Sequence, residues 1–111
     1  MATDYKILGQ SKPSAQTEVI VYTVPTTNTA VISTITIANM SSELNSKYKL
    51  AVVPSGRASA DDNNFIAHNT TVLADDAIGL TLGVTLGAND SIRANVEYAN
   101  LAINVFGSEV Y

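Results

Sequence analysis

Apolar and polar residues alternate along most of the chain, most regularly near its C-terminal end. In SIRANVEY (residues 91–98), four apolar residues, with Tyr98 the last of them, alternate with four polar ones. A strand period of two fits the whole segment, and no helical period does. Another alternating run, LAINVFGSEV (residues 101–110), follows after only Ala99 and Asn100. We therefore expect two strands joined as a C-terminal hairpin, with Tyr98 in the core.

Runs rich in β-branched residues recur from Thr17 onward, separated by turn residues such as proline, asparagine and aspartate. The remaining runs are TEVIVYTV, AVISTITIANM, KYKLAVV, FIAHN, TTVL and AIGLTLG. None offers the long, capped apolar stripe that a helix requires. The sequence therefore predicts an all-β chain of about seven or eight antiparallel strands, packed as a single β-sandwich of the jelly-roll or immunoglobulin-like type.

Two of these runs differ in how many of their faces are apolar. The run at residues 30–40 has Ile32 on one face and Ile35 on the other, so we expect both faces to be partly covered. In residues 47–53, Tyr48 alternates with lysines, which predicts one core face that includes Tyr48 and one solvated face.

The N-terminal segment and one internal segment lack strand patterning. Residues 1–16 are mostly polar, so we expect an extended arm in which only Ile7 and Leu8 dock as a short strand, ahead of a sandwich domain at residues 17–111. Residues 55–64 form the longest stretch without an apolar run, and we interpret them as a mobile surface loop.

Three glycines, Gly79, Gly83 and Gly87, recur at every fourth position in the segment AIGLTLGVTLG. A phosphate-binding loop would need a following lysine or a helix, and here a strand follows, so we interpret Gly83 and Gly87 as bends or bulges. We expect Asn89 and Asp90 to form an exposed corner. The residues that we expect to be mostly buried are Leu80, Leu82, Val84 and Leu86.

The length and charge of the chain restrict its partners. A chain of 111 residues is long enough for one core. Six basic and ten acidic side chains give a net charge of −4, and the basic ones are scattered, which argues against nucleic-acid binding. No apolar run is long enough for a signal peptide or a membrane span, so we expect no membrane partner.

Residues for catalysis or metal binding are scarce. His68 is the only histidine and there is no cysteine, so neither a Ser-His-Asp triad nor a transition-metal site is indicated. Acidic clusters at residues 61–64, 75–76 and 89–90 lack the spacing of a calcium loop, and we interpret them as turn residues. A structural calcium ion or a glycosidase acid pair at these clusters is the alternative. We expect no enzyme activity, no cofactor and no metal.

Exposed apolar, aromatic and cationic side chains are the candidates for an interaction surface. The sequence has no tryptophan, so a sugar-binding surface would have to use phenylalanine or tyrosine. A carbohydrate- or receptor-binding module with its site near residues 55–64 is therefore the alternative to a purely structural role. The residues that we expect at an interaction surface are Tyr5, Ile7, Leu8, Arg57, Phe65 and Phe106.

Several segments together carry a resemblance to a known family. They are YTVPTTNTAVISTITIANMSS, LAVVPSG, FIAHNTTV, LTLGVTLGANDSIRA and NLAINVFGSEV. The chain resembles, from about Tyr5 to its C-terminus, a family of small all-β virion structural proteins of tailed bacteriophages, common in marine and cyanobacterial phages. The most specific markers are the Tyr-Thr-Val-Pro turn, the Leu-Thr-Leu-Gly segment and the closing Phe-Gly-Ser-Glu.

The resemblance implies a non-enzymatic virion subunit that assembles in the host cytoplasm. Its expected partners are further copies of itself and other phage tail or capsid proteins, with a host-surface glycan as the partner under the alternative hypothesis. It would sit on the tail, baseplate or fibre apparatus, or decorate the capsid. The N-terminal arm and the run at residues 30–40 are the expected contacts between subunits.

Overall fold

The computed structural model describes residues 2–111, which form eight β-strands and one short 3-10 helix. The strands are β1 (Thr3–Ser11), β2 (Val19–Thr23), β3 (Thr29–Asn39), β4 (Ser46–Val53), β5 (Phe65–Val72), β6 (Ala77–Leu86), β7 (Ser91–Val96) and β8 (Leu101–Val110). The 3-10 helix, η1 (Asp62–Asn64), lies in the long loop between β4 and β5. The all-β prediction is confirmed.

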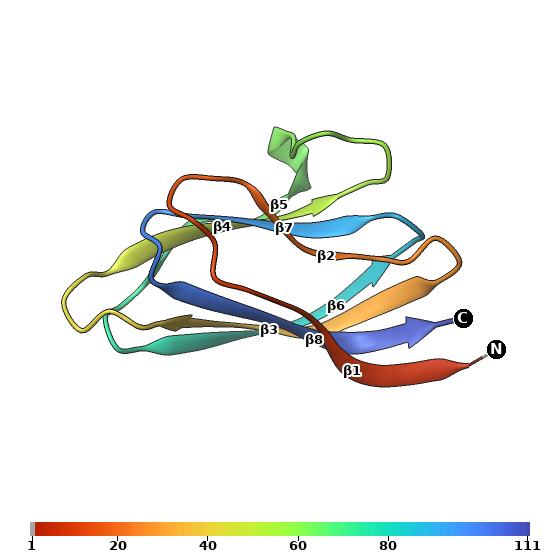
Figure 1. The fold of residues 1–111 in the computed structure, drawn as a ribbon, viewed down its shortest axis with the longest axis horizontal. Helices are drawn as coiled ribbons and strands as arrows, with labels where there is room; N and C mark the ends of the chain where they lie inside the picture. Colours follow the sequence, from red (N-terminus) through yellow and green to blue (C-terminus); the bar gives the residue numbers. More distant parts are fainter. Residues whose placement is uncertain (1) are drawn as a thin grey trace.

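The strands form two four-stranded antiparallel sheets that pack face to face (Figure 1). The first sheet has the order β1-β8-β3-β6 and the second has the order β2-β7-β4-β5. All connections except the one between β4 and β5 cross from one sheet to the other. This order is that of an eight-stranded jelly roll, so the structure confirms the predicted sandwich and selects one of the two predicted types.

The predicted C-terminal hairpin is wrong. β7 belongs to the second sheet and β8 to the first, so the connection after Val96 carries the chain across the sandwich. Two strands with one apolar face each show the same alternation whether they pair side by side or face each other across a core. Tyr98 lies beyond the end of β7 with 42% of its surface exposed, so its predicted core position is also wrong.

The strand expected at Ile7 and Leu8 is present but longer than predicted, because residues 3–11, predicted to be mostly an extended arm, form the edge strand β1. β1 pairs along β8, from Thr3 opposite Val110 to Ser11 opposite Ile103. Its polar side chains suit an edge strand, whose backbone groups are satisfied on one side by a neighbouring strand. A bulge between Ile7 and Gly9 leaves Leu8 as an extra residue, which packs against the core.

The apolar residues on both faces of β3 also have a structural explanation. Ile32 pairs with Gly107 of β8 and Thr34 pairs with Phe106, so Ser33 is an extra residue on β3. The extra residue shifts the period by one position, and both Ile32 and Ile35 face the core. The predicted placement of Ile32 and Ile35 on opposite faces is therefore wrong.

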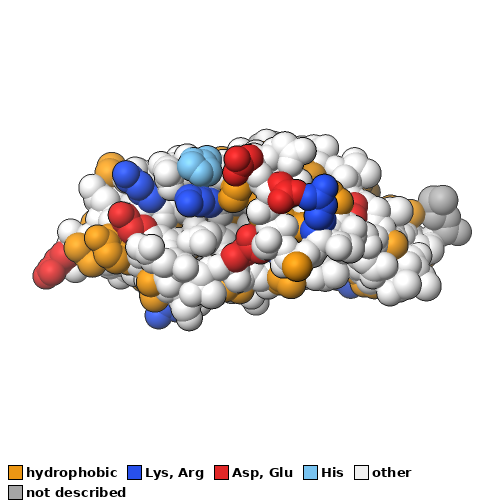
Figure 2. Space-filling view, turned by 90° about the horizontal axis from the view of Figure 1, so that it is seen from above, with side chains coloured by type: hydrophobic (Ala, Val, Ile, Leu, Met, Phe, Trp, Pro, Cys, Tyr) orange, Lys and Arg blue, Asp and Glu red, His pale blue; other side chains and the backbone are white. Residues whose placement is uncertain are grey.

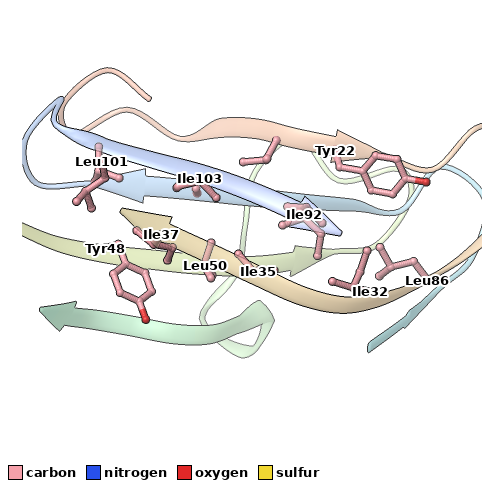
Figure 3. Close-up of a cluster of buried hydrophobic side chains, with 14 of the residues drawn as sticks. Tyr22, Ile32, Ile35, Ile37, Tyr48, Leu50, Leu86, Ile92, Leu101 and Ile103 are labelled. Carbon is pink, nitrogen blue, oxygen red and sulfur yellow. The ribbon is translucent and has the colours of Figure 1, made fainter. Parts of the chain in front are cut away.

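The core fills the space between the sheets (Figure 3). Tyr48 is buried as predicted, and Leu86 is fully buried. Leu80, Leu82 and Val84 are only partly buried, against the edge of the core, because β6 is an edge strand. β6 carries an extra residue at its pairing with β3 between Thr81 and Val84, which confirms a bulge at the Gly83 position. Asn89 is exposed with φ 66°, at the predicted corner.

Candidate interaction surfaces

The structure places five of the six predicted interaction residues on the two outer faces of the sandwich. Tyr5, Ile7 and Phe106 lie on β1 and β8, and their register places them together on the outer face of the first sheet. Arg57 and Phe65 belong to the long loop and to β5, on the side of the second sheet. The sixth residue, Leu8, points inward and is not available for a partner.

Outward side chains of the first sheet line up in rows across its four strands. Residues directly opposite each other in antiparallel strands share a face. The Gln10 side-chain amide donates a hydrogen bond of 2.7 Å to Asn104 Oδ1, which is consistent with this alignment. We call this outer surface the neutral face, and its main rows are Tyr5-Ser108-Val31-Thr85, Ile7-Phe106-Thr34-Thr81, Gln10-Asn104-Thr36-Gly79 and Ala102-Ala38-Ala77.

Within the described residues, the strands of the neutral face carry no outward-facing charged side chain, and Lys12, just beyond β1, borders the face beside Gln10, Ala102 and Asn104. The strands of the first sheet contain only three charged residues, Asp4, Lys6 and Glu109, and the register places all three on the inward side. One end of the face is apolar, since Tyr5 is 86% exposed and Ile7 54% exposed. Uncharged surface with exposed aromatic and aliphatic groups is typical of protein interfaces.

Glu109 turns inward and links three strands. Lys6 Nζ lies 2.6 Å from Glu109 Oε1, and the Tyr22 hydroxyl donates a hydrogen bond of 2.6 Å to Glu109 Oε2. These two hydrogen bonds, with that of Lys6 the stronger, hold the pKa of Glu109 below its ordinary value despite burial. Burial and the Glu109 hydrogen bond raise the pKa of the Tyr22 hydroxyl. The cluster joins the edge strands β1 and β2 of the two sheets.

On the opposite side of the molecule, Arg93 fastens the long loop to the second sheet. Its guanidinium donates hydrogen bonds to Ala58 O at 2.7 Å and to Arg57 O at 3.0 Å. The same group lies 3.0 Å from Glu18 Oε2 and donates to Ser91 Oγ at 3.1 Å. The loop that the sequence predicts to be mobile is therefore anchored at its centre.

A polar groove runs over the outer face of the second sheet, beside the anchored loop. Its larger part has a volume of about 130 Å³ and its side-chain lining comes from Gln16, Lys47, Lys49, Asn69, Asn95 and Glu97. A neighbouring hollow of about 60 Å³ shares two of these residues and adds Glu18, Phe65 and Arg93. Figure 2 looks onto this side, where acidic and basic side chains gather close together. We call the two parts together the polar groove.

Sequence reasoning missed the polar groove because its residues come from four separate parts of the chain. Only Phe65 was among the predicted interaction residues. It packs edge-to-face on His68, with 5.4 Å between ring centroids. The one available signal was the polar half of residues 91–98, which places Arg93 and Asn95 on the same face of β7.

The acidic clusters serve the turns, in agreement with our interpretation of them as turn residues. Asp90 accepts hydrogen bonds of 2.8 Å from the backbone N–H groups of Ser55 and Gly87. Asp61 pairs with Arg57 in the long loop. Within residues 2–111, no group of three histidine, cysteine, aspartate or glutamate side chains is placed to hold a metal ion.

Comparisons with protein-family models and with curated proteins find no match to this chain. In the described part of the chain, no helix has the length and hydropathy needed to cross a membrane.

Proposed function

We propose that this chain is a non-enzymatic structural subunit of a tailed-phage particle, present in many copies on the tail, baseplate or fibre apparatus or on the capsid surface. The neutral face is the observation that carries the proposal, because it is the surface through which neighbouring copies would pack. The sequence resemblance to small virion proteins supports the phage context. The jelly roll is compatible with it, since viral capsid domains use this fold, although a fold alone does not fix a function.

The size of the neutral face suits a stable interface. The molecule extends over 47 × 27 × 19 Å, and the view along the shortest axis shows both sheets edge-on (Figure 1). The longest and shortest extents enclose the face in a rectangle of roughly 900 Å², an upper limit on its projected area, against about 800 Å² per partner in a typical stable complex. Two copies that packed through the strands of this face would bury no charged side chain of those strands.

The proposal is tested by one matched pair of substitutions. Ile7→Lys places a charge at the apolar end of the neutral face, and Ile20→Lys places one on β2 of the second sheet, where the isoleucine is 52% exposed against 54% for Ile7. We expect wild type and Ile20→Lys to self-associate in sedimentation equilibrium and to enter purified phage particles. We expect Ile7→Lys to do neither while keeping its fold. A monomeric wild type that is absent from particles would refute the proposal.

A further inference from the structure

The polar groove is bounded by backbone in an unusual conformation. Gln16 and Asn69 have φ values of 56° and 51°, in the left-handed region that non-glycine residues seldom adopt. Gln16 is held there because its N–H donates a hydrogen bond of 2.7 Å to Val96 O. Asn69 lies inside β5, where the pairing with β4 is irregular. Gln16 adopts this conformation in a turn, but Asn69 does so inside a strand, and bulges of this kind redirect side chains at binding sites.

The groove is also preformed. Two of its charged lining residues are fixed by the neighbouring loop. Arg93 donates hydrogen bonds to the carbonyl groups of Arg57 and Ala58. Glu18 accepts a hydrogen bond of 3.1 Å at its Oε1 from the Ala60 N–H. A ligand would therefore not have to order these two side chains, which reduces the entropic cost of binding.

The chemistry of the lining points to a ligand with many hydroxyl groups. Side-chain amides from three parts of the chain both donate and accept hydrogen bonds, lysines donate and Glu97 accepts. Hydroxyl groups need this mixture, because each both donates and accepts. Phe65 at the end of the groove adds an apolar surface for the C–H face of a ring.

We propose that the polar groove is a carbohydrate-binding site for one pyranose ring. Its volume of about 130 Å³ is small for a nucleotide or a lipid. Lys47 and Lys49 outnumber Glu97 and favour a sugar that carries a carboxylate, whereas a bare sulfate would lack the contacts that a sugar ring makes with the amides and with Phe65. Neither lysine forms an ion pair within residues 2–111, so both ammonium groups are available to such a ligand.

The site is independent of the proposed assembly role, because the groove and the neutral face lie on opposite sides of the sandwich. The test is an NMR titration of the full chain with glucuronate, glucose and sodium sulfate. We expect millimolar binding of glucuronate and weaker binding of glucose, with amide shifts at Lys49, Asn69 and Asn95. Sulfate should cause no comparable shifts.

A matched pair of variants sharpens the test. Asn95→Ala should weaken glucuronate binding about tenfold, the value of one good hydrogen bond. Asn104→Ala, at a similarly half-buried asparagine on the neutral face, should bind like wild type. Lys49→Met is a second groove variant, and we expect it to weaken glucuronate binding by a similar factor. Retained spectral dispersion shows that each variant is folded.

Three results would overturn the carbohydrate site. They are no shifts with either sugar, shifts of equal size with sulfate, and equal binding by Asn95→Ala and Asn104→Ala.

Discussion

Gly107 shows how closely the strands of the first sheet approach each other at the bulge in β3. A Cβ atom added to Gly107 would lie well inside van der Waals contact with the carbonyl oxygen of Val31. We expect Gly107→Ala to lower the free energy of unfolding by about 2–4 kcal/mol, because backbone cannot move aside as a flexible side chain can. Urea denaturation measures this loss.

Gly83→Ala is the matched control, because a Cβ at Gly83 meets nothing within 4 Å. Gly83 also lies outside the left-handed region. We expect the free energy of unfolding of Gly83→Ala to differ from that of wild type by less than about 0.5 kcal/mol. Equal losses at the two positions would contradict the close approach of β8 to β3.

Glu109 makes stability depend on pH. Its pKa in the folded protein lies below the ordinary value of 4.5, so the ionised form stabilises the fold above that pH and the contribution disappears as the pH falls through the folded pKa. We expect Glu109→Gln to lower the melting temperature at about pH 7, with the gap to wild type narrowing towards about pH 3. Thermal unfolding of both proteins at several pH values measures this difference in melting temperature. A constant gap would contradict the Lys6 and Tyr22 contacts.

At the level of single residues, alternation predicted most of the core but not the bulges. Ile32 and Ile35 both face inward only because Ser33 adds one residue to β3. Leu8 reaches the core for the same reason, through the bulge in β1. The extra residue of a bulge shifts the period-two pattern, so the sequence places apolar residues on both faces of a regular strand. The pattern alone therefore does not distinguish a bulged strand from a strand buried on both sides.

Among the elements, the long loop depends on Arg93 far more than on its own ion pair. Arg93→Met should leave the carbonyl groups of Arg57 and Ala58 without their donor and should destabilise the protein by about 2 kcal/mol. Hydrogen exchange should rise in residues 55–64 and stay low in the central strands. Urea denaturation and hydrogen exchange by mass spectrometry measure the two effects.

Arg57→Met is the control for this loop. Arg57 pairs with Asp61, and both side chains are about half exposed, so their ion pair should contribute no more than about 1 kcal/mol. An Arg57→Met variant that loosened the loop as much as Arg93→Met would show that Arg93 is not its anchor.

The pairing of the strands was harder to predict than their positions in the sequence. The alternation in β7 and β8 locates both elements but does not specify their partners, because the order of a jelly roll is set by contacts between distant segments. β1 illustrates the opposite case, since its polar residues lacked a strand pattern and its pairing with β8 decided its structure. The polar groove could not be predicted either, because four distant segments form it.

Across the whole molecule, charge is distributed unevenly, and this determines how assembly should respond to salt. An interface on the strands of the neutral face buries no charged side chain of those strands, while each copy carries a net charge of −4 that weakly repels its neighbour. We expect association to strengthen slightly, by less than about threefold, between about 0.05 and 0.5 M NaCl, as measured by sedimentation equilibrium. Strong weakening by salt would indicate ion pairs and a different interface.

A charge placed in the neutral face should weaken association. Thr85→Glu puts a carboxylate at an exposed position in the row of Tyr5 and Val31, where assembly would remove it from water without a partner. We expect this variant to remain folded and to associate at least about tenfold more weakly than wild type. Thr71→Glu adds the same charge at an exposed position on β5 in the second sheet, so it should associate like wild type. Equal weakening in both variants would mean that added net charge, rather than the neutral face, controls assembly.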